Sequence, residues 1–262
     1  MRTAMELAGF DERVAIVTGA TGGIGRAVMK SLHDAGAVVA ALDRDAAACA
    51  ALAREIGAGA HGYGLDLRRA DDIDPVVDRV ERDLGPIACL VNVAGVLVAA
   101  PALETDAAAW DAMFDVNARG AFLVSRAVAR RMLPRRQGGI VTVASNAAGV
   151  PRHGMAAYAA SKAAAVMITR SLGLELGRHG IRCNVVAPGS TRTAMLSALW
   201  RDPSDEAQVI AGSLETFKPG IPLGRIGEPQ DVANAVLFLL SDQAAHVTMA
   251  VVAVDGGAAQ TT

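Results

Sequence analysis

The chain of 262 residues is poor in aromatic side chains, which make up only 3% of it, and it has three cysteines. Cys49, Cys89 and Cys183 are far apart and surrounded by apolar residues, so we expect buried thiols and neither a disulfide framework nor a metal site. No apolar run reaches the about 20 residues of a membrane-spanning helix, and residues 1–10 lack the apolar core of a signal peptide. We therefore predict a cytoplasmic protein that binds no membrane.

An excess of charge of either sign is also missing. Lysine and arginine together number 25 against 27 acidic residues, which gives a formal net charge of −2. No basic cluster with interleaved aromatic residues occurs, although that pattern is typical of nucleic-acid binding. The composition, 52% hydrophobic and 20% charged, indicates a folded globular protein. We predict one domain over residues 1–262 that acts on a small molecule, with no nucleic-acid partner.

Short apolar runs alternate with amphipathic segments of helical length. The predicted strands are residues 13–18, 37–42, 60–65, 87–92, 139–145, 181–186 and 250–254. Strands that are almost wholly apolar are buried on both faces, as in a parallel sheet with helices on each side. We therefore predict an α/β fold in which right-handed crossovers build a doubly wound parallel sheet.

The regular alternation stops between Pro188 and Gly227. Connections of this length usually form functional lids or carry helices of their own. Asp202-Pro203-Ser204 is typical of a helix start. We predict a helical lid over a pocket at about residues 190–226.

A glycine-rich run joins the first predicted strand to the helix after it. In Thr18-Gly19-Ala20-Thr21-Gly22-Gly23-Ile24-Gly25, the glycines let the backbone turn sharply and approach a pyrophosphate at the helix N-terminus. A tight turn alone would look similar, but a strand before and a helix after favour a dinucleotide site. Asp43 ends the second strand, where its carboxylate can accept hydrogen bonds from ribose hydroxyls and repel a 2′-phosphate. We therefore predict NAD rather than NADP.

Two neighbouring side chains leave alternatives open. Arg44 follows Asp43 and would soften the preference for NAD if it faced the ribose, although a solvent-facing arginine would look the same in the sequence. Asp66 follows the third strand and can either reach the adenine amino group or cap the next helix.

Tyr158 and Lys162 are four positions apart and share a face if their segment is helical. A fixed ammonium favours the phenolate, so we expect Lys162 to ease ionisation of Tyr158 and to make it a general base near neutral pH. Ser145 ends an apolar run, and a strand end beside this helix face would bring hydroxyl, phenol and ammonium together. The spacing alone is weak, because any surface helix can carry it.

Together the motifs resemble the short-chain dehydrogenase/reductase family over nearly the whole chain. The match also includes Asn92-Val93-Ala94-Gly95 after the fourth strand, and Pro188-Gly189. The resemblance implies a seven-stranded Rossmann sheet, nicotinamide hydride transfer and usually a homotetramer. It implies a catalytic tetrad of Asn117, Ser145, Tyr158 and Lys162. It implies cofactor contacts at Gly19, Thr21, Gly23, Ile24, Gly25, Asp43, Asp66, Leu67, Asn92, Ala94, Gly95, Tyr158, Lys162, Pro188, Gly189 and Thr191.

A narrower resemblance is to family members that oxidise 2,3-dihydro-2,3-dihydroxybenzoate to 2,3-dihydroxybenzoate in catecholate siderophore biosynthesis. It rests on residues 145–152, 155–158, 172–176, 181–186, 188–191 and, in the lid, 212–223. It implies substrate contacts at Ser145, Arg152, Met155 and Tyr158. In one departure, that subfamily tends to carry acidic residues where this chain has Arg192 and Ala194.

The carboxylate of such a substrate needs a cation. Arg152 is the only arginine or lysine between Ser145 and Tyr158, and its planar fork suits a carboxylate. A surface or interface arginine is the alternative, and Arg192 is a rival for the same role. His153 is interpreted as a surface histidine.

Other functions stay open. A related ring such as dihydro-3-hydroxyanthranilate, or an unrelated secondary alcohol, would use the same catalytic residues. A 3-oxoacyl carrier-protein reductase is disfavoured, because Asp43 opposes the NADPH that such enzymes usually use. A non-catalytic dinucleotide-binding scaffold would not need Asn117, Ser145, Tyr158 and Lys162.

Overall fold

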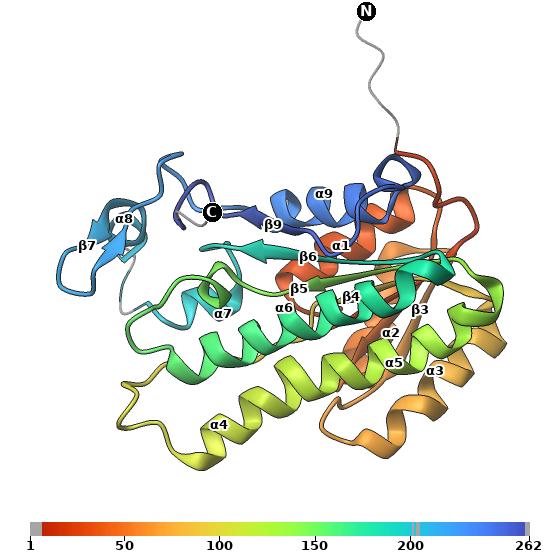
Figure 1. Ribbon diagram of the computed structural model, residues 1–262, viewed down its shortest axis with the longest axis horizontal. Coiled ribbons are helices and arrows are strands. Elements are labelled where there is room, and N and C mark those ends of the chain that lie inside the picture. Colours follow the sequence, from red (N-terminus) through yellow and green to blue (C-terminus); the bar gives the residue numbers. More distant parts are fainter. Residues whose placement is uncertain (1–6, 201, 203–204, 260–262) are drawn as a thin grey trace, which may run out of the picture.

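A computed structural model describes residues 7–200, 202 and 205–259, and within them seven strands form one parallel sheet (Figure 1). The strand order is β3-β2-β1-β4-β5-β6-β9. The strands are β1 (Val14–Thr18), β2 (Val38–Asp43), β3 (Ala60–Gly64), β4 (Ile87–Asn92), β5 (Gly138–Val143), β6 (Ile181–Pro188) and β9 (Val251–Val254). Each predicted run holds one strand, so the predicted doubly wound sheet is confirmed.

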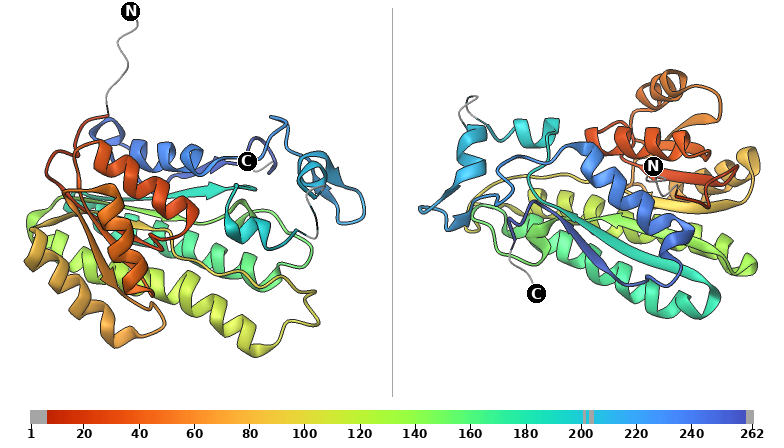
Figure 2. Two further views of the ribbon diagram at one scale, coloured as in Figure 1. Left: turned by 180° about the vertical axis from the view of Figure 1, so that it is seen from behind. Right: turned by 90° about the horizontal axis from the view of Figure 1, so that it is seen from above.

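Helices cover both faces of the sheet (Figure 2). Successive side chains of a strand point to opposite faces, so Ala15 and Val17 of β1 pack in one layer while Val14 and Ile16 pack in the other. The first layer contains α1 (Gly23–Asp34), α2 (Ala46–Ile56) and α9 (Pro229–Leu240). The second contains α3 (Ala70–Leu84), α5 (Ala121–Met132) and α6 (Ala156–Leu176). Short 3₁₀ helices follow or join these elements at η2 (Leu133–Arg135), η3 (Asn146–Ala148), η4 (Gly177–His179) and η5 (Asp242–Ala244).

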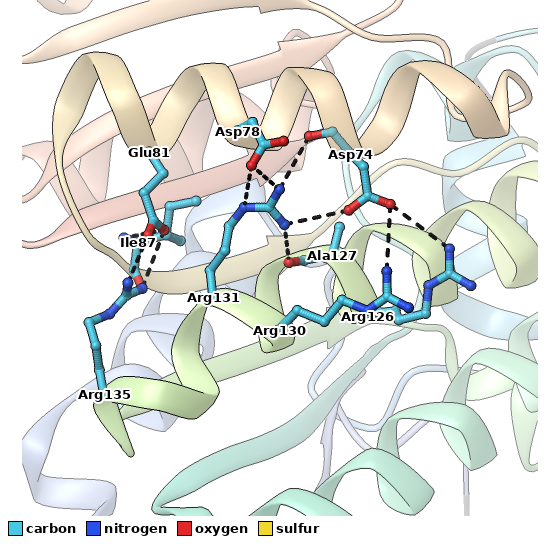
Figure 3. A network of polar contacts seen from close by, with 9 residues as sticks. All are labelled: Asp74, Asp78, Glu81, Ile87, Arg126, Ala127, Arg130, Arg131 and Arg135. Atoms are coloured by element: carbon cyan, nitrogen blue, oxygen red, sulfur yellow. Dashed lines mark hydrogen bonds and ion pairs between the residues drawn. The ribbon is translucent and has the colours of Figure 1, made fainter.

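A network of charges ties α3 to α5 on the outside of the second layer (Figure 3). Arg131 lies between Asp74 and Asp78, and its side chain is only 14% exposed. One turn further on, Arg135 donates to both Glu81 oxygens. Isolated surface ion pairs contribute about 0–1 kcal/mol, but a half-buried network also fixes the orientation of its helices.

A π-helical turn, η1 (Asp115–Gly120), joins α4 (Ala107–Phe114) to α5 without a break. Such turns are rare and occur frequently at functional sites. This one carries Asn117, which is buried.

The lid projects from the edge of the sheet where the strands end (Figure 1). Its helices α7 (Ala194–Ser197) and α8 (Asp205–Ala211) confirm the predicted helical character. A small hairpin of β7 (Gly212–Ser213) and β8 (Lys218–Pro219) follows, which the sequence did not predict. In the predicted helix start at 202–204, residues 203 and 204 lie outside the described residues. The lid packs on the segment after β9 through Ile221 and Ala258.

Among the described residues, no helix is both long and apolar enough to cross a bilayer.

Candidate active site

Two adjoining pockets open at the carboxyl ends of the strands. The strand order reverses between β1 and β4, and open α/β sheets bind ligands at such a switch point. The glycine-loop pocket, about 500 Å³, lies over the ends of β1 to β4. The tyrosine pocket, about 250 Å³, lies between Ser145, Tyr158 and the lid. Both are lined by Ile24, Val93, Gly95, Thr193 and Met195.

The glycine run has the shape that a pyrophosphate requires. Gly19 has a φ of +64°, and a Cβ there would lie 2.5 Å from the Cα of Ala94. A Cβ on Gly25 would lie 2.1 Å from the carbonyl oxygen of Gly19. Only glycine fits both positions, and α1 begins beside them at Gly23. The chain therefore offers a close backbone approach and a helix N-terminus, which fit a dinucleotide phosphate.

Asp43 lines the glycine-loop pocket and also holds the loop itself. One carboxylate oxygen accepts hydrogen bonds from the backbone nitrogen of Thr21 at 3.2 Å and from its hydroxyl at 2.6 Å. The other accepts from the backbone nitrogen of Arg44 at 2.8 Å. Arg44 is exposed and lines the same pocket. Asp43 is thus placed to meet a ribose while its orientation is fixed from the loop side.

Asp66 and Leu67 line the same pocket. Arg68 donates to both oxygens of Asp66, which lowers the pKa of this carboxyl. Helix α3 begins at Ala70, and Asp66 does not cap it. Of the two alternatives, helix capping is therefore excluded, and the carboxylate stands beside the pocket in an ion pair.

Asn92 does not bring its side chain to either pocket. Its amide nitrogen donates to Ser125 at 2.8 Å and to Thr142 at 3.4 Å, in a buried cluster between the sheet and α5. Asn92 and Leu90 have the same parity in β4, so both face the second layer. The residues that follow, Ala94 and Gly95, do line the glycine-loop pocket. The side chain of Asn92 is therefore engaged within the protein, and the predicted cofactor contact at this position stays a prediction.

Ser145, Tyr158 and Lys162 come together as their positions predict. Ser145 lies two residues after β5, and α6 carries Tyr158 and Lys162 one turn apart. The Ser145 hydroxyl acts on the phenol and favours its ionised form. The Lys162 ammonium lies 5.9 Å from the centre of the Tyr158 ring and donates to the carbonyl oxygen of Val143 at 3.0 Å. Tyrosine and lysine are both buried, at 9% and 4% exposure.

The expected ease of ionisation of Tyr158 is not found. Burial raises the pKa of Tyr158, and the hydrogen bond with Ser145 lowers it only in part. Burial also lowers the pKa of Lys162 to about 8, since the interior penalises its charge. The net shift of the Tyr158 pKa is therefore upward, because burial disfavours the phenolate more than the contact with Ser145 favours it.

Asn117 is held beside these groups from η1. Its oxygen accepts from the backbone nitrogen of Val96 at 2.8 Å, and its nitrogen donates to the carbonyl of Val96 and to Ser161, both at 2.9 Å. A Cβ on Gly95 would lie 3.1 Å from the Lys162 nitrogen and 3.3 Å from the Asn117 oxygen. Lys162 and Asn117 therefore meet at Gly95, which lines the tyrosine pocket together with Ser145 and Tyr158. Ser161, fully buried between Asn117 and the Tyr158 carbonyl, is a positioning residue that sequence reasoning missed.

The tyrosine pocket carries positive charge. Arg152, Lys162 and Lys218 line it, and none of the described residues that line it is acidic. Arg152 is half-buried and donates to the carbonyl of Ala258 at 3.3 Å. Burial lowers the pKa of Arg152, while Asp255 nearby raises it. Burial and then the charge of Arg152 lower the pKa of Lys218. Sequence reasoning missed Lys218, because the lid hairpin has no periodic pattern.

Arg192 lies elsewhere. It is exposed on the lid, where it makes a bidentate pair with Glu206 at 2.8 and 2.9 Å and a third bond to Glu228 at 2.9 Å. It does not line the tyrosine pocket. The charge of Arg192, the alternative to Arg152 as partner of the substrate carboxylate, is thus already neutralised by two carboxylates of the lid region.

The remaining predicted residues border the tyrosine pocket. Met155 precedes α6, Pro188 ends β6, and Gly189 and Thr191 follow it. A Cβ on Gly189 would lie 2.6 Å from that of Asp255. Asp255 accepts from the side chain of Asn146 at 3.1 Å and from the backbone nitrogens of residues 257 and 259. It therefore ties the loop after Ser145 to the segment after β9. His153 is exposed at the rim.

Known proteins that are similar to this chain include dehydrogenases and reductases. The family described as enoyl-(acyl carrier protein) reductase matches residues 19–259. A 2,3-dihydro-2,3-dihydroxybenzoate dehydrogenase of Bacillus subtilis is 50% identical over 97% of this chain and 98% of its own. An enzyme of the same name from Escherichia coli is 42% identical over 92% of this chain and 94% of its own.

A solved structure of a 3-ketoacyl-(acyl-carrier-protein) reductase from Brucella melitensis, complexed with NADH, superposes with a TM-score of 0.87. It is 30% identical, and the match covers 96% of this chain and all of that one. The chain belongs to the short-chain dehydrogenase/reductase family and is an oxidoreductase that uses a nicotinamide dinucleotide.

Proposed function

We propose that this chain oxidises 2,3-dihydro-2,3-dihydroxybenzoate to 2,3-dihydroxybenzoate with NAD. One observation carries the proposal: the pocket beside Tyr158 has three cationic residues and no acidic one among its described lining residues. Its other walls are largely apolar, with Leu97, Met155 and Leu199 among them. A small apolar ring with one carboxylate fits such a pocket. The similarity to dehydrogenases with this name supports the choice of ring.

The roles of the side chains follow from their positions. Tyr158 takes the proton of the C3 hydroxyl, and Ser145 hydrogen-bonds the oxygen as it becomes a carbonyl. Because its pKa is raised, the Tyr158 phenolate is a strong proton acceptor that forms more readily as the pH rises. Lys162 favours the phenolate and holds the nicotinamide ribose, while Asn117 supports Lys162 through a water. The bound nicotinamide supplies the acceptor for the hydride from C3, and the dienone product tautomerises to the catechol.

The preference for NAD is assigned to Asp43. The carboxylate lines the glycine-loop pocket at the end of β2, where the second ribose of a dinucleotide lies in such folds. A 2′-phosphate at this point would meet a like charge. Gly19 to Gly25 hold the pyrophosphate, residues 66–67 and 92–95 border the adenosine, and residues 188–191 the carboxamide.

The test is a comparison of substrates by NADH absorbance. 2,3-Dihydro-2,3-dihydroxybenzoate is compared with its amino analogue dihydro-3-hydroxyanthranilate and with the same dihydrodiol without a carboxylate. We expect the highest kcat/KM for the first and at least a tenfold loss without the carboxylate. Turnover of the amino analogue at a higher kcat/KM would reassign the ring, and no NADH with any of them would overturn the proposal.

We further propose that the chain works as a single domain within a homotetramer. Apolar side chains are exposed on α6, with Met167 at 59% and Leu174 at 73%. A second exposed apolar pair, Phe238 and Val251, lies on α9 and the edge strand β9. Two such surfaces can each pair with a copy of themselves, which gives four subunits. Light scattering at micromolar concentration checks this, and a monomeric mass would rule it out.

A further inference from the structure

Lysine is rare in this chain, and its placement is uneven. Only Lys30, Lys162 and Lys218 occur, and all other basic residues apart from histidine are arginine. Lys30 is on the surface of α1 in an ion pair with Asp34. Lys162 and Lys218 both line the tyrosine pocket. Lys162 belongs to the catalytic group, whereas Lys218 comes from the lid.

The lid hairpin holds Lys218 in place. Lys218 pairs with Ser213 across β7 and β8. Gly212 has a φ of +89°, and a Cβ there would lie 2.6 Å from the carbonyl oxygen of Lys218. A Cβ on Gly220 would lie 2.6 Å from the carbonyl oxygen of Ile210. Residues 212 and 220, which pack against the backbone of the hairpin, thus admit only glycine, and this fixes the course of the hairpin that carries Lys218.

Lys218 faces a like charge. Arg152 lines the same pocket and acts on Lys218 electrostatically, and the side chain of Lys218 is half-buried. Among the described residues, no carboxylate forms an ion pair with Lys218. The charge of Asp255 acts on Arg152, but the charge of Arg152 still disfavours that of Lys218, and an anion between the two would remove this cost.

We propose that Lys218 is a substrate-binding residue that holds the carboxylate of the ring together with Arg152. The proposed role of Lys218 rests on the proposed function, and it adds a second cation to the carboxylate site. Arg152 reaches the carboxylate from the loop after Ser145, and Lys218 reaches it from the lid, so the bound substrate ties the lid hairpin to the catalytic loop. A single carboxylate has enough acceptor sites for both donors.

Kinetics with two substrates test the role. In Lys218→Met we expect kcat/KM for 2,3-dihydro-2,3-dihydroxybenzoate to fall about tenfold, as for the loss of one hydrogen bond to a charged group. The loss should lie mainly in KM and be less than twofold for the dihydrodiol without a carboxylate. Lys218→Arg should recover part of the loss, because it restores the charge. Lys30→Met, a matched change on the surface, should leave both substrates unchanged.

A binding measurement gives a readout apart from turnover. Reductive ¹³C-methylation labels the three lysines and the N-terminal amine, and Lys218→Met assigns one NMR signal. We expect 2,3-dihydroxybenzoate to move that signal and leave that of Lys30 in place, while catechol moves neither. Thermal stability should rise with 2,3-dihydroxybenzoate in the wild type and rise less in Lys218→Met.

The outcomes separate the two proposals. If the wild type forms no NADH with the carboxylate substrate, the proposed function fails. If the wild type is active but Lys218→Met loses less than threefold, or loses equally on both substrates, only the role of Lys218 is overturned. A Lys218 signal that stays in place when 2,3-dihydroxybenzoate saturates the pocket would overturn it as well.

Discussion

The two pockets share one wall but differ in how their charges are satisfied. In the glycine-loop pocket, Asp66 is paired with Arg68, and Asp43 accepts two hydrogen bonds from Thr21 of the glycine loop and one from the backbone of Arg44. In the tyrosine pocket, Arg152 and Lys218 face each other, and no described lining residue is acidic. The first pocket is nearly neutral before it binds anything, whereas the second has a net positive charge.

This difference separates two kinds of recognition. Charges that are already paired can orient the hydroxyl groups of a ligand and reject a misplaced phosphate. Their electrostatic field outside the pocket is weak, because the paired charges cancel at a distance. Cations that outnumber the nearby carboxylates in a partly apolar pocket gain from any anion that reaches them. The cofactor side is therefore selective by geometry, and the substrate side is selective by charge. Each prediction below changes one residue and follows the effect on substrate, cofactor or stability.

The largest effect is expected at Tyr158. In Tyr158→Phe the ring still packs against the pocket, but the proton acceptor is lost, and general base catalysis typically contributes about 10²–10⁴ in rate. We expect kcat to fall by at least a hundredfold while NADH binding, measured by fluorescence titration, changes less than twofold. Activity above a few per cent of the wild type would remove Tyr158 from this role.

The second effect is on stability and its pH dependence. Lys162 has a folded-state pKa of about 8, against about 10.5 in the unfolded chain. Between these values the unfolded state binds more protons, so the contribution of Lys162 to the free energy of unfolding increases as the pH rises. The difference between wild type and Lys162→Met should change by about 3 kcal/mol between pH 7.5 and 10.5. Urea unfolding across this range checks it.

The comparison with Lys162→Met isolates this contribution. Burial raises the pKa of Cys49 and Cys89 to about 11. The free energy of unfolding therefore falls once the pH exceeds the pKa of a free thiol, because the unfolded state then loses these protons first. Both proteins carry these thiols, so their effect cancels in the difference. If the two stability profiles run parallel, Lys162 is not the group whose proton is displaced by burial.

Much of this comparison could be predicted from the sequence because local patterns carry it. Gly19 and Gly25 are needed where the backbone nearly touches itself, and Asp43 follows a strand whose end faces the dinucleotide. Tyr158 and Lys162 share a face through helix geometry alone. Gly25, Tyr158 and Lys162 depend on residues close in sequence, whereas Gly19 also lies against Ala94 in the loop after β4.

The rest depends on contacts that no local pattern shows. The net pKa of Tyr158 depends on burial by segments far apart in the chain, and Lys218 reaches the pocket through a hairpin whose glycines signal a turn but not its direction. Asn117 lies in a π-helical turn, whose extra residue shifts the face that a regular helix would present. The orientation of the Asn92 side chain could be predicted from the sequence, because Leu90 and Asn92 are two residues apart and share a face of β4.

A third prediction tests the charge of the tyrosine pocket at Arg152. A hydrogen bond to a charged group contributes about 1.5–3 kcal/mol, so Arg152→Ala should lower kcat/KM by roughly ten- to a hundredfold. The loss should be much smaller for the dihydrodiol without a carboxylate. Lysine should restore only part of the activity, because it lacks the planar fork. Steady-state kinetics with both substrates give the ratio.

Arg192→Ala is the matched control for Arg152. It removes an arginine whose guanidinium is held by Glu206 and Glu228 away from the pocket. We expect the ratio between the two substrates to change less than twofold. A selective loss in Arg192→Ala and none in Arg152→Ala would place the carboxylate on the outer side of the lid.

The smallest effect is expected on the cofactor side, where the charges are already paired. We expect the wild type to prefer NAD over NADP at least tenfold in kcat/KM, about 1.4 kcal/mol. Asp43→Ala should narrow this ratio, because it should lower kcat/KM with NAD more than with NADP.

Asp43 also anchors Thr21, so a control variant is needed to separate the charge of Asp43 from its effect on the loop. Thr21→Val removes the hydroxyl that donates to Asp43 and keeps the carboxylate, so it should weaken both cofactors alike. If Thr21→Val narrows the ratio as much as Asp43→Ala, loop anchoring explains the preference. If neither changes it, the selectivity does not come from Asp43, and Arg44, an exposed cation of this pocket, is the next residue to test with Arg44→Ala.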